Sequence, residues 1–275
     1  MDNFELLRLF EGLSDLFRAQ YYKPLWKKYD YLNDPMNATK LFLEGYAFER
    51  SGRSPAFAPA AIEAIKRTEN SKDFPLMVWD NFCDLLDDKG LNTKLNPLYP
   101  KYPLYHPTNS CNCIWCVLNF EKDFENIITS SKQALEKGQI KDAWEKLNKI
   151  QGIGPKIASL FLRDIAITYE DNFTPFAENR WLLQPIDIWV HRIVVALNKK
   201  SMSKGTKYKD VAQWIVENCS KPENCNQGMW YFGAKIAKTE FRLIEYLEDP
   251  QASVELHFGE LKANAQAILE MKTNW

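Results

Sequence analysis

Apolar residues recur at helical spacing along most of the chain, and this pattern limits the fold more than any other feature. The first example is the set Phe4, Leu7, Phe10, Leu13 and Phe17, which lie three or four residues apart and so share one face of a helix. We find almost no alternation with a period of two and no convincing pair of strands. The sequence therefore predicts an all-α protein with at least ten helices.

Prolines and turn residues divide these apolar segments into separate helices. A long stretch, 91–107, carries four prolines, and long ordered loops in compact domains are often functional. A second irregular stretch, 169–185, is rich in aromatic residues. We predict helices at about residues 4–17, 38–50, 74–86, 120–137, 140–150, 155–168, 188–198, 206–218, 229–247 and 254–271, with a further helix that ends near residue 68.

Length and composition are those of an ordinary globular protein. The chain has 275 residues, of which 45% are hydrophobic and 26% charged, so it is long enough for one large domain or two small ones. No run approaches the apolar length of a membrane span, and the N-terminus lacks the pattern of a signal peptide. We expect a cytoplasmic location, with the six cysteines reduced.

The charge balance bears on possible partners. The formal net charge is −1, which counts against nucleic-acid binding unless the charges are segregated. Residues 191–209 hold six lysines and arginines and no acid, whereas six acids fall within 240–260. A basic face opposite an acidic face is one interpretation. A solvated, lysine-rich turn explains the first run equally well.

The segment 147–158 combines an amphipathic helix, a turn with two glycines, and a second apolar helix. Gly152 and Gly154 allow a tight turn, and Pro155 suits the first position of a helix because no N–H is needed there. Backbone N–H groups at a helix start form an anion site that a DNA phosphate can occupy. Lys156 falls in the first helical turn, where the positive helix end disfavours a charged ammonium. A plain helix–turn–helix corner is the simpler reading.

A second motif, 184–192, reads Gln-Pro-Ile-Asp-Ile-Trp-Val-His-Arg. Asp187 precedes an apolar helical run, as an N-cap does. A carboxylate in that place can also be held at the mouth of a cleft beside an aromatic loop.

Together the two motifs resemble the helix-hairpin-helix, Gly/Pro-rich, Asp superfamily of DNA glycosylases, which includes endonuclease III and the adenine, 3-methyladenine and 8-oxoguanine glycosylases. Residues 150–158 match the hairpin, and Pro185-Ile186-Asp187 with Arg192 matches the second family motif. The resemblance implies a two-lobed helical fold with a cleft between lobes. One lobe would be 38–168, and the other would join 1–37 to 169–275.

The resemblance also implies catalytic roles. Lys156 matches the Schiff-base lysine of the bifunctional members, and Asp187 matches the essential carboxylate. A flipped-out nucleotide would enter a pocket, Asp187 would stabilise positive charge on the sugar, and neutral Lys156 would attack C1′. The two residues are 31 positions apart, a long separation that resembles the archaeal 8-oxoguanine branch. Lys156 as a mere phosphate contact is the alternative.

Further residues are candidates for holding DNA. Gly152, Gly154 and Arg192 would contact the backbone, as would Arg53 in the turn Arg-Ser-Gly-Arg-Ser-Pro at 50–55, although a surface turn is the default reading there. Aromatic faces can sandwich a flipped base, and core filling is at least as good an explanation for each of them. The candidates for this base pocket are Trp181, Trp189, Phe173, Trp230 and Phe232.

One cluster suggests a metal. Cys111, Cys113, Cys116 and His106 lie within eleven positions and would suffice for a tetrahedral zinc site. Free buried cysteines are the alternative. Endonuclease III carries a four-cysteine iron–sulfur loop after its catalytic Asp, whereas only Cys219 and Cys225 lie in that region here, so we expect no such cluster.

These observations lead to one main functional hypothesis and three rivals. The main hypothesis is a monomeric base-excision DNA glycosylase with AP-lyase activity that acts in the nucleoid on an oxidised purine such as 8-oxoguanine. A monofunctional glycosylase, a glycosidase for a free modified nucleoside or nucleotide, and a non-enzymatic DNA-binding scaffold are the rivals.

Overall fold

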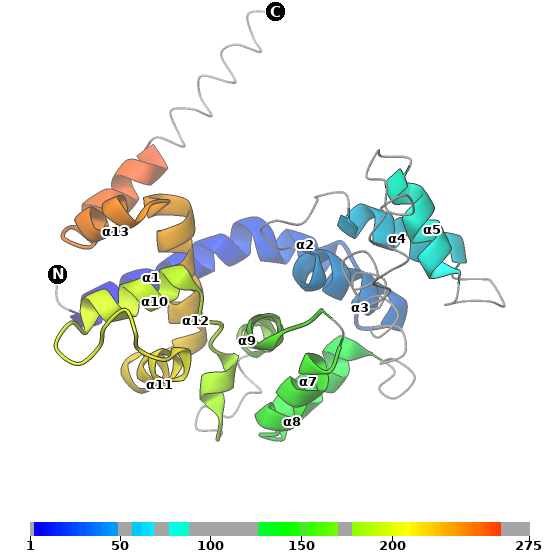
Figure 1. Cartoon of the computed structure of the whole chain (residues 1–275), viewed down its shortest axis with the longest axis horizontal. Coiled ribbons are helices and arrows are strands. Elements are labelled where there is room, and N and C mark those ends of the chain that lie inside the picture. Colours follow the sequence, from blue (N-terminus) through cyan, green and yellow to red (C-terminus); the bar gives the residue numbers. More distant parts are fainter. Residues whose placement is uncertain are drawn as a thin grey trace, which may run out of the picture. The chain divides into compact units, whose positions relative to one another are not determined.

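The computed structural model describes residues 3–48, 57–68, 77–87, 126–150, 152–169 and 178–259, and every regular element in these ranges is helical. The all-α prediction is confirmed for this part of the chain. The elements are α1 (Asn3–Phe17), the π-helix η1 (Arg18–Tyr22), α2 (Lys23–Lys27), α3 (Pro35–Phe42), the π-helix η2 (Leu43–Ala47), α4 (Phe57–Thr68), α5 (Val78–Asp87), α7 (Ile127–Glu136), α8 (Ile140–Asn148), α9 (Pro155–Thr168), the 3₁₀ turn η4 (Arg180–Leu183), α10 (Ile188–Leu197), α11 (Tyr208–Asn218), α12 (Pro222–Tyr231), the π-helix η5 (Phe232–Ala237) and α13 (Glu240–Tyr246) (Figure 1).

The chain forms two compact units. The central unit is Tyr21–Pro185, and the terminal unit joins Met1–Gln20 to Ile186–Trp275. A unit made from both ends of the chain was expected, but its boundaries were predicted at 37 and 169. Residues 21–37 and 169–185 belong instead to the central unit.

Side-chain contacts explain this difference in boundaries. Trp26 is buried in the core of the central unit, and its ring meets that of Tyr31 edge to face at 5.1 Å. The Tyr169 hydroxyl lies 3.3 Å from the Tyr31 hydroxyl. Leu182 and Leu183 of η4 are buried in the same core. Both segments therefore bury apolar side chains in the core of the central unit.

The core of the central unit is built around α9. Phe161 of α9 meets Phe42 and Tyr46 edge to face at 4.8 and 4.9 Å. Next to this aromatic group lies a buried ion pair in which Arg163 Nε and Nη2 donate to Asp164 Oδ1 at 3.0 and 2.9 Å. Burial and the Asp164 charge raise the pKa of the Tyr46 hydroxyl well above its usual value. Most of α9 is buried in this core, and this burial holds the turn that precedes the helix in place.

In the terminal unit, α1 packs along α12 (Figure 1). A Cβ on Gly228 would lie 1.7 Å from the Phe10 carbonyl oxygen, so the two backbones touch at this point. Ser14 Oγ donates to Gln227 Oε1 at 2.7 Å, and Phe10 meets Phe232 edge to face at 5.5 Å. Hydrogen bonds and ring packing thus join the first helix to the last third of the chain.

Some helix boundaries differ from those predicted. A helix was expected to begin near residue 229, but α12 begins at Pro222 and the chain then continues through η5. Pro222 suits this start because a first-turn proline sacrifices no hydrogen bond. Among the described residues, no helix has both the length and the apolar character that crossing a bilayer requires.

Candidate functional site

The predicted hairpin is present in the central unit as α8, a short turn and α9. Backbone N–H groups close the turn by i→i−3 bonds, from Ile150 to Leu147 at 3.0 Å and from Ile153 to Ile150 at 2.9 Å. Gly152 has φ of +83°, a left-handed conformation in which a side chain is strained. The glycine at this position is therefore required by the turn itself.

Gly154 needs a different explanation. It is the N-cap of α9 with φ of −92° and ψ of 176°, an extended conformation that any residue adopts. A Cβ at this position would meet no atom within 4 Å, so the surrounding space does not require glycine either. A glycine here leaves the start of α9 open to close approach by a ligand.

The two helices of the hairpin are fixed to each other and to the core. Trp144 Nε1 of α8 donates to Ser159 Oγ of α9 at 3.0 Å. Ile150, Ile153 and Ile157 are buried, so the turn is anchored from below by apolar side chains. The packed hairpin consequently holds Gly154, Pro155 and Lys156 at the surface.

Lys156 lies in the first turn of α9, after Pro155 at the first helical position, and its side chain is exposed. This is the place predicted for it. The next residues, Ile157 and Ala158, are buried. Their packing in the core fixes the backbone at Lys156.

Asp187 is the N-cap of α10 in the terminal unit. Its Oδ1 accepts hydrogen bonds from the N–H groups of Trp189 at 2.9 Å and Val190 at 3.0 Å. The side chain is half-buried. The predicted N-cap is therefore present, and these two bonds fix the orientation of the carboxylate.

Arg192, predicted to bind the DNA backbone, has an acidic partner within the terminal unit. Its Nη2 lies 2.7 Å from Glu240 Oε2, and Lys204 Nζ lies 3.1 Å from Oε1 of the same carboxylate. The hydrogen bond from Lys204 and the Arg192 charge lower the pKa of Glu240. A phosphate at Arg192 would have to compete with Glu240.

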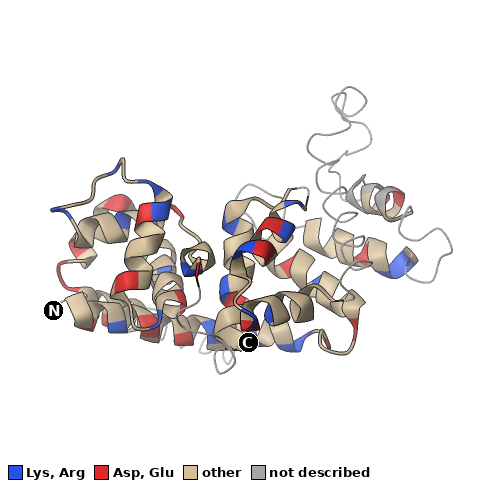
Figure 2. Cartoon of the chain, turned by 90° about the horizontal axis from the view of Figure 1, so that it is seen from below, with Lys and Arg blue, Asp and Glu red and all other residues tan. Residues whose placement is uncertain are grey.

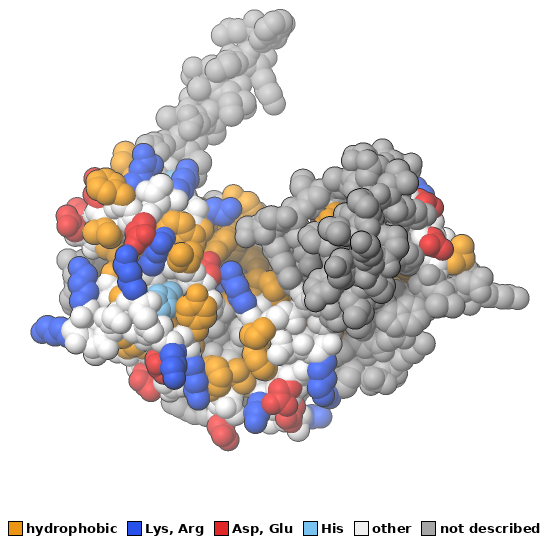
Figure 3. Space-filling model, in the orientation of Figure 1, with side chains coloured by type: hydrophobic (Ala, Val, Ile, Leu, Met, Phe, Trp, Pro, Cys, Tyr) orange, Lys and Arg blue, Asp and Glu red, His pale blue; other side chains and the backbone are white. Residues whose placement is uncertain are grey.

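These ion pairs also bear on the two interpretations of the charged runs. Glu240 begins the acidic run and Arg192 and Lys204 belong to the basic one, yet they pair with each other. Figure 2 shows basic and acidic residues interspersed along the described helices. On the face seen in Figure 3, charged side chains of both signs alternate with apolar ones. Arg192 and Lys204 from the basic run and Glu240 from the acidic run therefore lie together rather than on opposite faces.

The aromatic candidates for a base pocket have different surroundings. Trp189 packs on Gly233, where a Cβ would come within 2.7 Å of Trp189 Cβ, and the Arg192 guanidinium lies 5.7 Å from its ring centre. Trp230 meets Phe17 edge to face at 5.2 Å, with Lys235 Nζ 5.7 Å from its ring centre. Both tryptophans are partly exposed, so each keeps part of its ring at the surface.

Two further candidates pack against cores. Phe232 is 0% exposed and packs against Phe10 in the terminal unit, so its predicted role in stacking on a base is wrong for this structure. Phe232 is buried because it follows α12 directly, on the side that contacts α1. Trp181 is only half-buried and packs on the core of the central unit.

Several predicted residues lie outside the described part of the chain. They are Arg53, Phe173, His106, Cys111, Cys113 and Cys116. Among the described residues, no group of three or more His, Cys, Asp or Glu side chains is arranged to hold a metal ion. The zinc hypothesis for the cysteine cluster thus stays a prediction.

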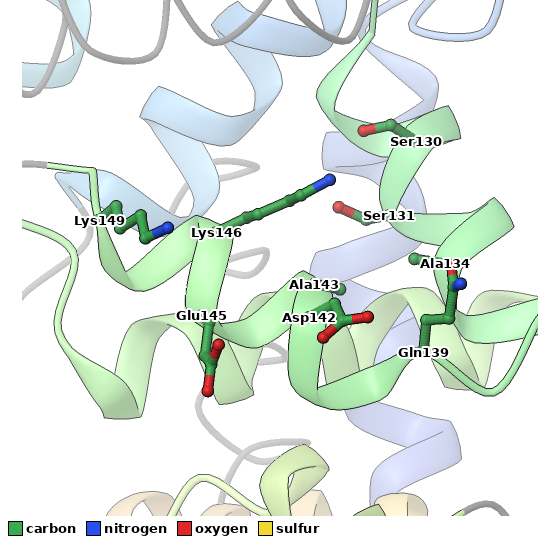
Figure 4. Close-up of a pocket in the computed structure, with 9 residues that line it drawn as sticks. All are labelled: Ser130, Ser131, Ala134, Gln139, Asp142, Ala143, Glu145, Lys146 and Lys149. Atoms are coloured by element: carbon green, nitrogen blue, oxygen red, sulfur yellow. The ribbon is translucent and has the colours of Figure 1, made fainter.

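A polar hollow lies between α7 and α8, and it was not predicted from the sequence. Its volume is about 330 Å³. Ser130, Ser131 and Ala134 line it from α7, and Asp142, Lys146 and others line it from α8 (Figure 4). The two serines stand at successive positions of an amphipathic helix, a pattern that solvent exposure also produces. Only the packing of α7 beside α8 reveals that they face a common space.

Comparison with known proteins gives one match to a curated protein. Over 212 residues the chain is 29% identical to "Uncharacterized protein MJECL21" of Methanocaldococcus jannaschii. The match covers 70% of this chain and 48% of that protein, so the chain spans about half the length of the curated relative. No family model matches the sequence, and no solved structure matches it.

Proposed function

We propose that the protein is a base-excision DNA glycosylase with an associated lyase activity. The observation that carries the proposal is the start of α9, where Gly154 leaves the helix N-terminus open and Lys156 is exposed one residue after Pro155. Neither the conformation of Gly154 nor the space around it explains the glycine, whereas the approach of a ligand backbone does.

Backbone binding is the first step of the proposed reaction. The N-terminus of a fourteen-residue helix carries a partial positive charge and N–H groups that face outward. A DNA phosphate fits this position without any base-specific contact. The hairpin would therefore position the strand and leave recognition of the base to other residues.

Breaking the glycosidic bond is the second step. As the C1′–N bond breaks, positive charge develops on the sugar, and a carboxylate held nearby lowers the free energy of that transition state. Asp187 suits this role because hydrogen bonds from two backbone N–H groups fix its carboxylate before the substrate arrives. The departing base takes the bonding electron pair and is then protonated.

The third step is covalent. The nitrogen lone pair of Lys156 attacks C1′, a proton leaves the nitrogen, and opening of the sugar ring gives an imine. Loss of the C2′ proton then expels the 3′ phosphate as the C3′–O bond breaks, which nicks the strand. This mechanism requires the Lys156 amine and the Asp187 carboxylate to act on one sugar.

The proposed substrate is an oxidised purine such as 8-oxoguanine. The support is the long separation of Lys156 and Asp187 in the sequence, which resembles the archaeal 8-oxoguanine branch. Of the aromatic residues predicted to hold a base, Trp189 and Trp230 in the terminal unit are partly exposed and so have surface left for stacking.

A glycosidase for a free modified nucleoside is the second candidate. The pairing of Arg192 with Glu240 and the net charge of −1 favour it, because both weaken attraction to a polyanion. This candidate predicts no salt-dependent binding of duplex DNA. A DNA affinity that falls steeply as salt rises would exclude it.

The direct test is a panel of duplexes that each contain one lesion, assayed for release of the free base. Wild type should release an oxidised purine, and Asp187→Asn should lose at least about a hundredfold in rate. Asparagine keeps the N-cap acceptor, so the fold should survive while the charge is removed. Asp210→Asn in α11 is the matched control. Equal rates for wild type and Asp187→Asn would refute the proposed role.

A further inference from the structure

The hollow between α7 and α8 has the features of a built polar site. It has the volume of a small ligand, about 330 Å³, and all nine lining residues belong to the central unit. Ala134 and Ala143 contribute short side chains, which leave the space open. None of the residues assigned to the glycosylase reaction lines it.

Ser131 is the residue that most needs an explanation. The residue as a whole is only 4% exposed, although it lines the hollow. Serines within helices usually bond to a carbonyl three or four residues earlier, as Ser130 does to Ile127 at 3.5 Å. In Figure 4 the Ser131 hydroxyl points into the hollow. A hydroxyl directed at an open space can donate to or accept from a ligand atom.

Lys146 supplies a positive charge at the same end of the hollow. Its side chain extends from α8 toward Ser130 and Ser131 (Figure 4). An ammonium together with hydroxyl donors is a receptor for a phosphate or another oxyanion. Lys149, at the C-cap of α8, adds a second positive charge to the lining.

The opposite end of the hollow favours hydrogen-bond donors. The Asp142 carboxylate and the Gln139 side chain lie there, away from the two serines (Figure 4). A carboxylate repels a bare anion and accepts from a hydroxyl group. The ligand should therefore carry an oxyanion at one end and hydroxyl groups at the other.

We propose that this hollow binds a small sugar phosphate, with the phosphate on Ser131 and Lys146 and the sugar hydroxyls on Asp142 and Gln139. Free sugar phosphates offer both groups within the available volume. A strand of duplex DNA offers the phosphate but no deoxyribose hydroxyl within its backbone, so it fits only half of the site. This proposal does not rest on the glycosylase activity.

Isothermal titration calorimetry of the full chain with ribose 5-phosphate tests the proposal. Ribose 5-phosphate should bind with a dissociation constant of about 1 mM or tighter, and more tightly than either ribose or inorganic phosphate. Ser131→Ala and Lys146→Met should each weaken binding about tenfold, because each removes a partner of the phosphate. Ala134→Leu should abolish binding by filling the hollow.

Matched controls separate local from general effects. Ser130→Ala, whose hydroxyl already has a carbonyl partner, should weaken binding less than Ser131→Ala. Lys137→Met removes an exposed lysine that does not line the hollow and should leave affinity unchanged. Absence of binding in wild type, or equal affinity for wild type, Ser131→Ala and Lys146→Met, would overturn the proposal. So would duplex DNA binding that depends on these two residues while ribose 5-phosphate does not bind.

Discussion

Trp144 and Ser159 join the two helices of the hairpin, because the indole N–H donates to the serine hydroxyl at 3.0 Å. Ser159 is 7% exposed. Removing the indole N–H while keeping a ring at position 144 would leave this hydroxyl without its donor. We therefore expect Trp144→Phe to lower the free energy of unfolding by about 1 kcal/mol, as measured by urea denaturation.

A double-mutant cycle isolates this hydrogen bond from the change in packing. Ser159→Ala alone should cost a similar amount, and the double variant should cost clearly less than the sum, with a coupling energy of about 1 kcal/mol. Strict additivity of the two single variants would show that the bond contributes nothing.

Replacement by alanine should destabilise the protein at one hairpin glycine and not at the other. Gly152→Ala forces a side chain into the left-handed region at φ of +83° and should cost about 1–2 kcal/mol of stability. Gly154→Ala meets neither strain nor a neighbouring atom and should change stability by less than about 0.5 kcal/mol. Thermal melting of both variants measures the contrast.

Binding data complete that comparison. If a DNA phosphate approaches the start of α9, a methyl group on Gly154 should raise the dissociation constant for duplex DNA about fivefold or more in fluorescence anisotropy. Gly12→Ala in α1 is a control with the same chemical change, since a Cβ on Gly12 would meet no atom within 4 Å and its φ is not positive. Unchanged DNA affinity in Gly154→Ala would remove the main support for the hairpin as a phosphate site.

The contact between Gly228 and Phe10 sets a stricter limit on substitution. A Cβ at 228 would lie 1.7 Å from the Phe10 carbonyl oxygen, which belongs to backbone and cannot rotate away. Gly228→Ala should force α1 and α12 apart and cost about 3 kcal/mol or more. Reduced recovery of folded protein and a lower melting temperature are the expected readouts. A melting temperature equal to wild type would contradict this close approach.

Glu240 should give the terminal unit a small dependence of stability on pH. The Lys204 hydrogen bond and the Arg192 charge hold the pKa of Glu240 below the ordinary value of 4.5. The carboxylate thus stabilises the fold above the unfolded pKa, and this contribution is lost as pH falls through the folded pKa. Glu240→Gln should melt about 1–2 °C lower than wild type at pH 7. The difference should vanish well below pH 4.5 and shrink at high salt.

Local features of the fold were accessible from the sequence. Helical spacing predicted the helical class, and the Gly-x-Gly-Pro order predicted that a helix starts at Pro155, as it does. The N-cap role of Asp187 followed from its position before an apolar run. Each of these features depends on residues close together in the chain, where periodicity and capping chemistry act directly.

Long-range contacts were not accessible in the same way. Arg192 pairs with Glu240, 48 residues later, and no local pattern indicates that partner. The burial of Phe232 depends on the packing of α1 against α12. The position of Ser131 in a hollow follows only from the packing of α7 beside α8. In each case the missing information is which helix faces which.

The most direct test of the proposed mechanism is borohydride trapping on a duplex that contains one 8-oxoguanine. A Schiff base between Lys156 and C1′ should be reduced to a stable protein–DNA adduct in wild type, and Lys137→Gln should give the same adduct. Lys156→Gln should give none. Base release without any adduct in wild type, or an undiminished adduct in Lys156→Gln, would contradict the assignment of Lys156 as the nucleophile.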